Sequence, residues 1–142
     1  DEGKVVIADR YVYSNIGYQC AKIEDEAERT KLRQWIFDLE YDYNKIPRPD
    51  LSLFLDVPFA FTERKLLQEQ REGDDRAYLN GQKDIHEQSM DLQRAVRQVY
   101  LDAAEYDENL HVVDCSTQSN EMASPEEIFR RIEVVVENCL NR

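Results

Sequence analysis

Three short apolar segments, separated by stretches with helical spacing, place the strongest limit on the fold of this chain. Residues 4–8, 51–57 and 110–114 are short and rich in Val, Ile, Leu and Phe, and prolines bound the second segment. Runs of this length and composition favour buried β-strands, although periodicity alone does not separate them from buried helix. Strands that alternate with helices are typical of α/β domains with a parallel sheet. The sequence therefore predicts one α/β domain with three visible strands.

Helices are predicted between and after these strands, from apolar residues that recur three and four positions apart or from a proline suited to a first turn. They cover residues 25–44, 58–70 and 86–105, approximately, and a last helix begins after residue 124. The apolar stripes consist of Leu32, Trp35, Ile36, Leu39 and Tyr43 in the first helix, Leu92, Ala95, Val96, Val99 and Ala103 in the third, and Ile128, Ile132, Val135 and Cys139 in the last. The last helix has a capping box, in which Ser124 is the cap, Pro125 suits the first turn and Glu127 completes the box.

The composition is that of a soluble globular protein, with 42% apolar and 34% charged residues among 142. No apolar run can span a bilayer and no leader-like segment opens the chain, so we expect a cytoplasmic protein. The net charge of −12 argues against binding to nucleic acid polymers, which requires a basic surface. A small phosphate ligand is still compatible with it, because a few arginines in one cleft create a local positive field.

The three cysteines, Cys20, Cys115 and Cys139, are far apart and form no CxxC pair. We expect reduced thiols, two of them in core positions. A zinc site would need more ligands at closer spacing than these thiols and the two histidines supply.

Asp9-Arg10-Tyr11 follows the first predicted strand directly. In an open α/β sheet, ligands bind at the carboxyl ends of the strands. At such a position an aspartate can hold Mg²⁺ or its bound water, and an arginine can clamp a phosphate through two N–H donors. A loop salt bridge or a helix cap is the alternative, and the tripeptide alone does not decide between them.

The residues after this tripeptide are suited to a nucleoside. Asn15 and Gln19 are four positions apart and share a helical face, with Tyr18 adjacent and Ser14 nearby. Amide side chains offer the paired donor and acceptor that a base edge needs, and tyrosine offers a flat wall. An ordinary polar helix face is the alternative.

The polar stretch of residues 71–84 is a candidate lid. It contains Arg71 and Arg76, and Arg64 lies on the helix before it. Mobile arginines that close over two substrates stabilise the charge that develops in phosphoryl transfer, and a lid excludes water. The alternative, which the stretch taken alone favours, is a solvated loop whose arginines pair with neighbouring acidic residues.

The end of the third predicted strand, Asp114-Cys115-Ser116, can cradle a base with its backbone or form a plain turn into the last helix. None of the four glycines begins a GxxxxGK[ST] loop. The sequence therefore lacks the loop that surrounds the phosphates of ATP with backbone N–H groups.

Two segments, DRYVYSNIGYQ at residues 9–19 and PRPDLSLFLDVP at residues 47–58, resemble the thymidylate kinase family. The lid-like residues 71–76 and the turn at residues 112–114 follow in the family's order, so that the resemblance spans nearly all of residues 4–140. It implies a P-loop kinase fold with a five-stranded parallel sheet and helices on both faces. Residues 1–142 would then be the C-terminal part of a single nucleoside-monophosphate-kinase-like domain, with three of its five strands and without the phosphate-binding segment.

The resemblance also implies ATP and Mg²⁺ as cofactors, dTMP as the second substrate and a homodimer as the assembly. Asp9 would sit at the Mg²⁺ and phosphate centre, and Arg10 would bind the 5′-phosphate of dTMP. Arg76, and with it Arg71, would act on the transferring phosphoryl group. The remaining residues implied are Ser14, Asn15, Tyr18 and Gln19 in the dTMP pocket, and Arg64, Arg76, Asp114, Cys115 and Ser116 at ATP.

The reaction implied for the complete protein is dTMP + ATP → dTDP + ADP, and we expect little or no activity from the 142-residue chain alone. A deoxynucleoside kinase shares the architecture but accepts an unphosphorylated nucleoside, so it is the enzymatic alternative. The non-catalytic alternative is a kinase-derived module that binds nucleotides or partners without transferring phosphate.

Overall fold

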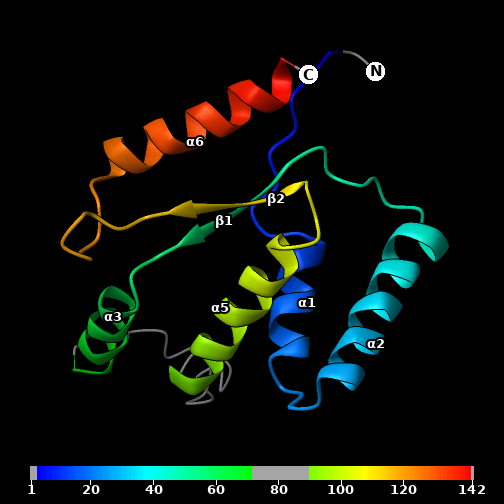
Figure 1. Cartoon of the computed structure of the whole chain (residues 1–142), viewed down its shortest axis with the longest axis horizontal. Coiled ribbons are helices and arrows are strands. Elements are labelled where there is room, and N and C mark those ends of the chain that lie inside the picture. The colour runs from blue at the N-terminus through cyan, green and yellow to red at the C-terminus, as the bar shows by residue number, and fades with distance from the viewer. Residues whose placement is uncertain (1–2, 72–89, 142) are drawn as a thin grey trace.

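The computed structural model of the chain describes residues 3–71 and 90–141. Helices and short strands alternate in it (Figure 1). In chain order the elements are α1 (Val12–Cys20), α2 (Glu26–Phe37), the π-helix η1 (Asp38–Tyr43), β1 (Ser52–Asp56), α3 (Phe59–Arg71), α5 (Met90–Ala104), β2 (Leu110–Asp114) and α6 (Pro125–Leu140).

The strands β1 and β2 pair in parallel, with Ser52 opposite Leu110 and Asp56 opposite Asp114. Both lie where the sequence predicts them. Figure 1 shows α6 on one side of the pair and α1 and α5 on the other. The chain thus has the mixed helix and strand architecture of a P-loop kinase-type α/β fold, with a two-stranded parallel sheet in its described part.

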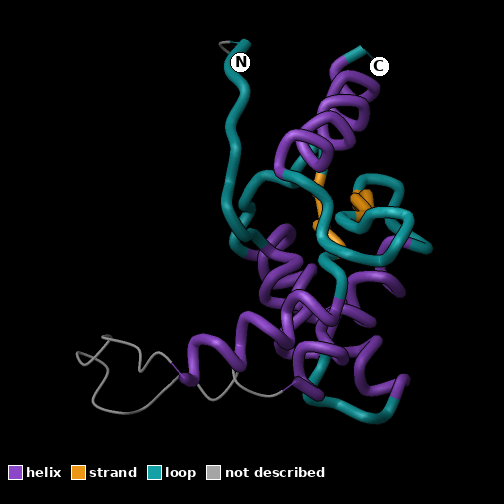
Figure 2. The backbone as a smooth tube through the Cα atoms, turned by 90° about the vertical axis from the view of Figure 1, so that its left-hand side faces the viewer, coloured by secondary structure: helices purple, strands orange, loops and turns teal. Residues whose placement is uncertain are grey.

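The strand predicted at residues 4–8 is not formed. These residues are a loop (Figure 2), and the side chains of Val5, Val6 and Ile7 are 72%, 88% and 91% exposed. Composition favours an extended strand here, but a strand also needs a neighbouring edge to which its N–H and C=O groups can bond. In the described part of the chain, β1 and β2 pair only with each other. The predicted count of three strands is therefore wrong for this structure.

The first predicted helix is confirmed as α2 continued by η1. Asp25 caps it, because its carboxylate accepts a hydrogen bond from the Glu28 backbone N–H at 2.8 Å. The apolar stripe is narrower than predicted: Ile36 is buried, whereas Trp35 is 59% exposed and Tyr43 is also exposed. Residues at adjacent positions lie about 100° apart around a helix, so Trp35 and Ile36 cannot share the centre of one face.

The other predicted helices are confirmed as α3, α5 and α6, although residues 86–89 of the predicted third helix lie outside the described residues. The capping box of α6 is present, with Ser124 and Glu127 bonded reciprocally. Ile128 is buried against Cys115 and Ala123, while Phe129 on the same helix is exposed. Among the described helices, none has the length and apolar character that crossing a bilayer requires.

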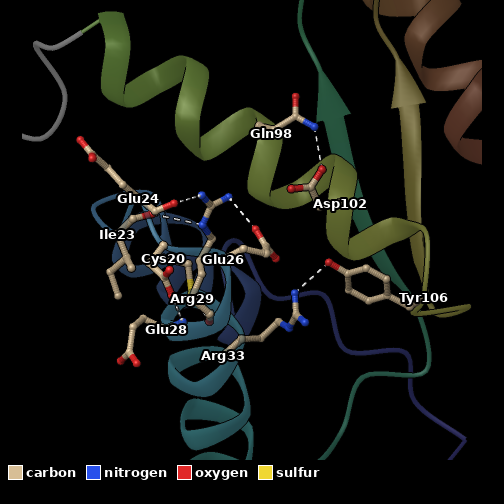
Figure 3. Close-up of polar contacts among 11 residues, drawn as sticks. Cys20, Ile23, Glu24, Glu26, Glu28, Arg29, Arg33, Gln98, Asp102 and Tyr106 are labelled. Atoms are coloured by element: carbon tan, nitrogen blue, oxygen red, sulfur yellow. Dashed lines mark hydrogen bonds and ion pairs between the residues drawn. The ribbon is translucent and has the colours of Figure 1, made fainter.

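The helix α1 is held between α2 and α5. Ile16 and Cys20 of α1 belong to the main core cluster together with Ile36 of α2 and Val99 of α5. Hydrogen bonds from two arginines one turn apart hold α2 to its surroundings (Figure 3): Arg29 donates to the Ile23 and Glu24 carbonyls at 3.2 and 3.1 Å, and Arg33 donates to the Tyr106 hydroxyl at 2.8 Å.

All three cysteines are free, and Cys20 and Cys115 occupy the core positions that the sequence predicts, each 1% exposed. Burial raises the pKa of both thiols, which lowers their reactive thiolate fraction. Cys139 of α6 is only half-buried.

We expect Cys139 to react with an aromatic disulfide reagent at pH 8 at least about tenfold faster than Cys20 and Cys115 in the 142-residue chain, because buried thiols react only when the chain opens. Mass spectrometry of the singly labelled chain checks this, with Cys139→Ser as the control that should lose the fast phase. Early label on Cys20 or Cys115 would contradict the packing around them.

Candidate nucleotide site

Arg10 lies at the entrance to α1 in a strained backbone conformation. Its φ of 68° is in the left-handed region, which non-glycine residues rarely adopt. Its guanidinium carbon stands 5.6 Å from the centre of the Tyr18 ring, two turns further along α1. Backbone strain of this kind concentrates at functional sites, where the surrounding structure enforces it. The Arg10 side chain is exposed, so a ligand can reach its guanidinium beside the Tyr18 ring.

Tyr100 of α5 joins this group from the other side. Its ring stacks on Phe54 of β1, with centres 4.4 Å apart and planes inclined by 5°. Burial raises the pKa of the Tyr100 phenol, whereas the nearby Ser14 hydroxyl and the positive charge of Arg10 lower it. The structure thus brings Arg10, Ser14, Tyr18 and Tyr100 together.

Asn15 and Gln19 form the neighbouring, solvent-exposed part of α1. The Gln19 amide oxygen accepts a hydrogen bond from the Lys22 ammonium at 3.4 Å. The prediction that the two amides share a helical face next to Tyr18 agrees with α1 as it is formed, because their four-residue spacing is one helical turn.

Asp9 is exposed directly before Arg10. Within the described residues, no group of three or more His, Cys, Asp or Glu side chains could hold a metal ion. A lone carboxylate still fits Mg²⁺, which typically takes one or two protein carboxylates and completes its shell with water and substrate phosphates. Asp9 therefore suits a Mg²⁺ ion that arrives with a nucleotide.

The turn after β2 is held by its own hydrogen bonds. The Asp114 carboxylate accepts from the Ser116 backbone N–H at 2.8 Å and from the Ser116 hydroxyl at 2.7 Å, and these bonds lower its pKa. The Cys115 N–H donates to the Asp56 carbonyl at 3.0 Å. The N–H groups of Cys115 and Ser116 are therefore engaged, and the Cys115 carbonyl in turn accepts a hydrogen bond from the Ala123 N–H at 2.8 Å.

Two arginines organise this end of the sheet, and sequence reasoning missed both. Arg97 of α5 forms a bidentate ion pair with Asp56, at 2.6 and 2.7 Å. Arg131 of α6 donates to the carbonyls of Asp114 and Ser116 at 2.5 and 2.9 Å. A signal was present for Asp56, because it ends a predicted strand as Asp114 does. Nothing in the local pattern distinguishes Arg97 or Arg131 from other surface arginines.

The predicted lid, residues 71–84, lies outside the described residues except for the backbone of Arg71. Arg76 lies outside the described residues, as does the Arg71 side chain. Arg64 of α3 is exposed, and its Nε donates to the Ala60 carbonyl one turn earlier at 3.3 Å.

Comparison with known proteins gives a consistent result. The thymidylate kinase family model matches residues 1–125. A "Probable thymidylate kinase" of Pyrococcus abyssi is 32% identical over 140 residues, which are 99% of this chain and 55% of that protein. One of Thermococcus gammatolerans is 34% identical over 140 residues, covering 96% of this chain and 53% of that protein. A "Thymidylate kinase" of Ligilactobacillus salivarius is 29% identical over 117 residues, covering 82% and 50%.

The chain thus spans about half the length of the curated relatives it matches. No solved structure matches it significantly.

Proposed function

Because the chain belongs to the thymidylate kinase family, we propose that the complete protein phosphorylates dTMP with ATP, giving dTDP and ADP. In this reaction an oxygen of the dTMP phosphate bonds to the γ-phosphorus of ATP while the bond from that phosphorus to the β–γ bridging oxygen breaks. The protein's task in such a transfer is positioning and electrostatic stabilisation.

The placement of Arg10 is the observation on which the proposal depends. Arg10 directly precedes the N-cap of α1 and its guanidinium stands over the ring of Tyr18, and the first turn of α1 has neither a side-chain cap nor an acidic residue. An uncapped helix N-terminus favours an anion, and guanidinium donates two parallel N–H groups to a phosphate. We assign Arg10 to the 5′-phosphate of dTMP.

The other acceptor-side roles follow from the same helix. Tyr18 lies beside Arg10, where its ring would flank the deoxyribose and leave no room for a 2′-hydroxyl. Asn15 would reach the thymine edge with its amide, and Ser14 and Gln19 would line the pocket. Exposure of Asn15 and Gln19 keeps both amides available to a base.

On the donor side, Asp9 would hold Mg²⁺, which supplies charge neutralisation at the transferring phosphate when bound. The exocyclic amine of adenine is a hydrogen-bond donor, and it would bond the second lone pair of the Asp114 or Ser116 carbonyl, since Arg131 already donates to both oxygens. Arg64 would flank the same base. Arg71 and Arg76, as lid arginines in residues 71–84, would stabilise the transferring phosphoryl group.

We further propose that residues 1–142 form the C-terminal part of a single kinase domain, completed by a P-loop segment that this sequence lacks. The exposed Val5, Val6 and Ile7 provide an apolar run that such a segment could cover. We propose a homodimer as well, with the exposed Trp35 of α2 as one contributor. The 142-residue chain alone is expected to be inactive.

Comparing acceptors tests the proposed function. We expect the complete protein to favour dTMP over thymidine by at least about 100-fold in kcat/KM, because a site built around a phosphate leaves an arginine unpaired when the phosphate is missing. Coupled detection of ADP measures both rates, with the 142-residue chain as the control without turnover. A preference for thymidine would identify a deoxynucleoside kinase, and nucleotide binding without turnover would identify a non-catalytic module.

A further inference from the structure

Tyr100 occupies a junction that no role assigned above explains. It lies on α5, yet it contacts β1 through Phe54 and α1 through Gly17 and Ser14. The neighbouring aromatic residue Tyr13 also packs near Tyr100, with ring centres 6.4 Å apart, but its hydroxyl donates to the Asp107 carboxylate, away from the candidate site. Tyr100 is therefore the tyrosine of this cluster whose polar end meets the side of α1 that carries Ser14.

The Tyr100 ring has little freedom to move. Its stack on Phe54 is nearly parallel, at 4.4 Å, and the Asp56–Arg97 ion pair lies two residues further along β1 and one helical turn earlier on α5. An offset aromatic stack and a bidentate ion pair together fix the part of α5 that faces β1. The position of the Tyr100 ring is thus set by the sheet.

Through Gly17, the position of α1 depends on the position of the Tyr100 ring. A β-carbon at Gly17 would come within 2.7 Å of the Tyr100 Cε2 atom, closer than real β-carbons approach. Helix and ring are therefore in direct contact along one turn of α1. Ser14 and Tyr18 lie on either side of Gly17, and Arg10 stacks on Tyr18.

We propose that Tyr100 is a positioning residue for the acceptor: its ring sets the distance of α1 from the sheet, so that Arg10 and Tyr18 are both in place to contact a nucleoside monophosphate. This inference rests on the proposed function of Arg10 and Tyr18. It deepens that function, because it makes monophosphate affinity depend on a residue that does not touch the monophosphate.

Two substitutions in the complete protein separate the hydroxyl from the ring. Tyr100→Phe keeps the ring and should leave the KM for dTMP within about twofold of wild type. Tyr100→Leu removes the stack and should raise the KM for dTMP by about tenfold or more. The KM for ATP should stay within about twofold in both variants, and dTMP binding by calorimetry should weaken in parallel.

Tyr106→Phe is the matched control, because Tyr106 is an exposed tyrosine that bonds Arg33 instead; it should leave both KM values unchanged. Gly17→Ala provides a variant outside α5 and should reproduce the selective loss of dTMP affinity. Equal changes in the two KM values, or a Tyr100→Leu protein identical to wild type, would overturn the inference. If dTMP were not a substrate of the wild type, the proposed function would fail and this inference with it, whereas a dTMP-dependent wild type with an unaffected Tyr100→Leu would refute the inference alone.

Discussion

Replacing Arg10 by glutamine in the complete protein is expected to lower kcat/KM for dTMP by about 100-fold or more. Two charge-assisted hydrogen bonds to a phosphate, at about 1.5 kcal/mol each, correspond to about 3 kcal/mol and hence to that factor. Glutamine at a φ of 68° bears the same backbone strain as arginine, so the change removes the charge and the donor pair without relaxing the loop. Steady-state kinetics with dTMP varied at saturating ATP measures the effect.

Arg10→Lys makes this test sharper, because lysine keeps the charge but not the planar pair of donors. We expect it to recover only part of the lost dTMP affinity. Arg130→Gln, a change at an exposed arginine of α6, is the control and should behave as wild type. An Arg10→Gln protein with unchanged dTMP affinity would show that this guanidinium does not meet the phosphate, and the proposed function would then lose its main support.

Local chemistry made several elements predictable. The capping box around Ser124 and Glu127 depends on residues three positions apart, so the start of α6 could be placed from sequence to the residue. The strands β1 and β2 are short apolar runs bounded by turns, and their parallel pairing follows from the helices between them. In each case the residues that decide the structure are neighbours in the chain.

The loop at residues 4–8 was not predictable in this way, and the sequence predicted a strand there instead. Val5, Val6 and Ile7 have the composition of a buried strand, but a strand exists only where another strand offers its edge, and composition cannot report on that. The prediction of which side chains of α2 are buried contained a smaller error of the same kind. Spacing placed Trp35 and Ile36 in one stripe, and only packing against α1 decides which of them is covered.

The candidate site likewise has a part that local sequence predicts and a part that only tertiary packing determines. Arg10, Ser14 and Tyr18 fall within nine residues of chain, and their grouping follows from one helix after one loop. Tyr100, Arg97 and Arg131 come from helices far along the sequence, and they reach the site only because α5 and α6 pack on opposite sides of β1 and β2. Their roles depend on tertiary contacts, for which a single sequence contains no local signal.

The packing that places α1 can be measured directly. Ile16→Ala in the 142-residue chain is expected to lower the free energy of unfolding by about 2–5 kcal/mol, because Ile16 is 0% exposed in the core shared by α1, α2 and α5, and its removal leaves a cavity. Urea denaturation followed by circular dichroism gives the value, provided that the slope of the transition is the same in both proteins.

Ile7→Ala is the matched control, since it deletes the same atoms from a side chain that is 91% exposed. It should change the free energy of unfolding by no more than about 0.5 kcal/mol. The pair tests two statements at once, because a large loss at Ile7 would mean that residues 4–8 are packed in the isolated chain, contrary to the loop found here. A small loss at Ile16 would mean that α1 is not fixed by the core, and the close approach of Gly17 to Tyr100 would then have no structural basis.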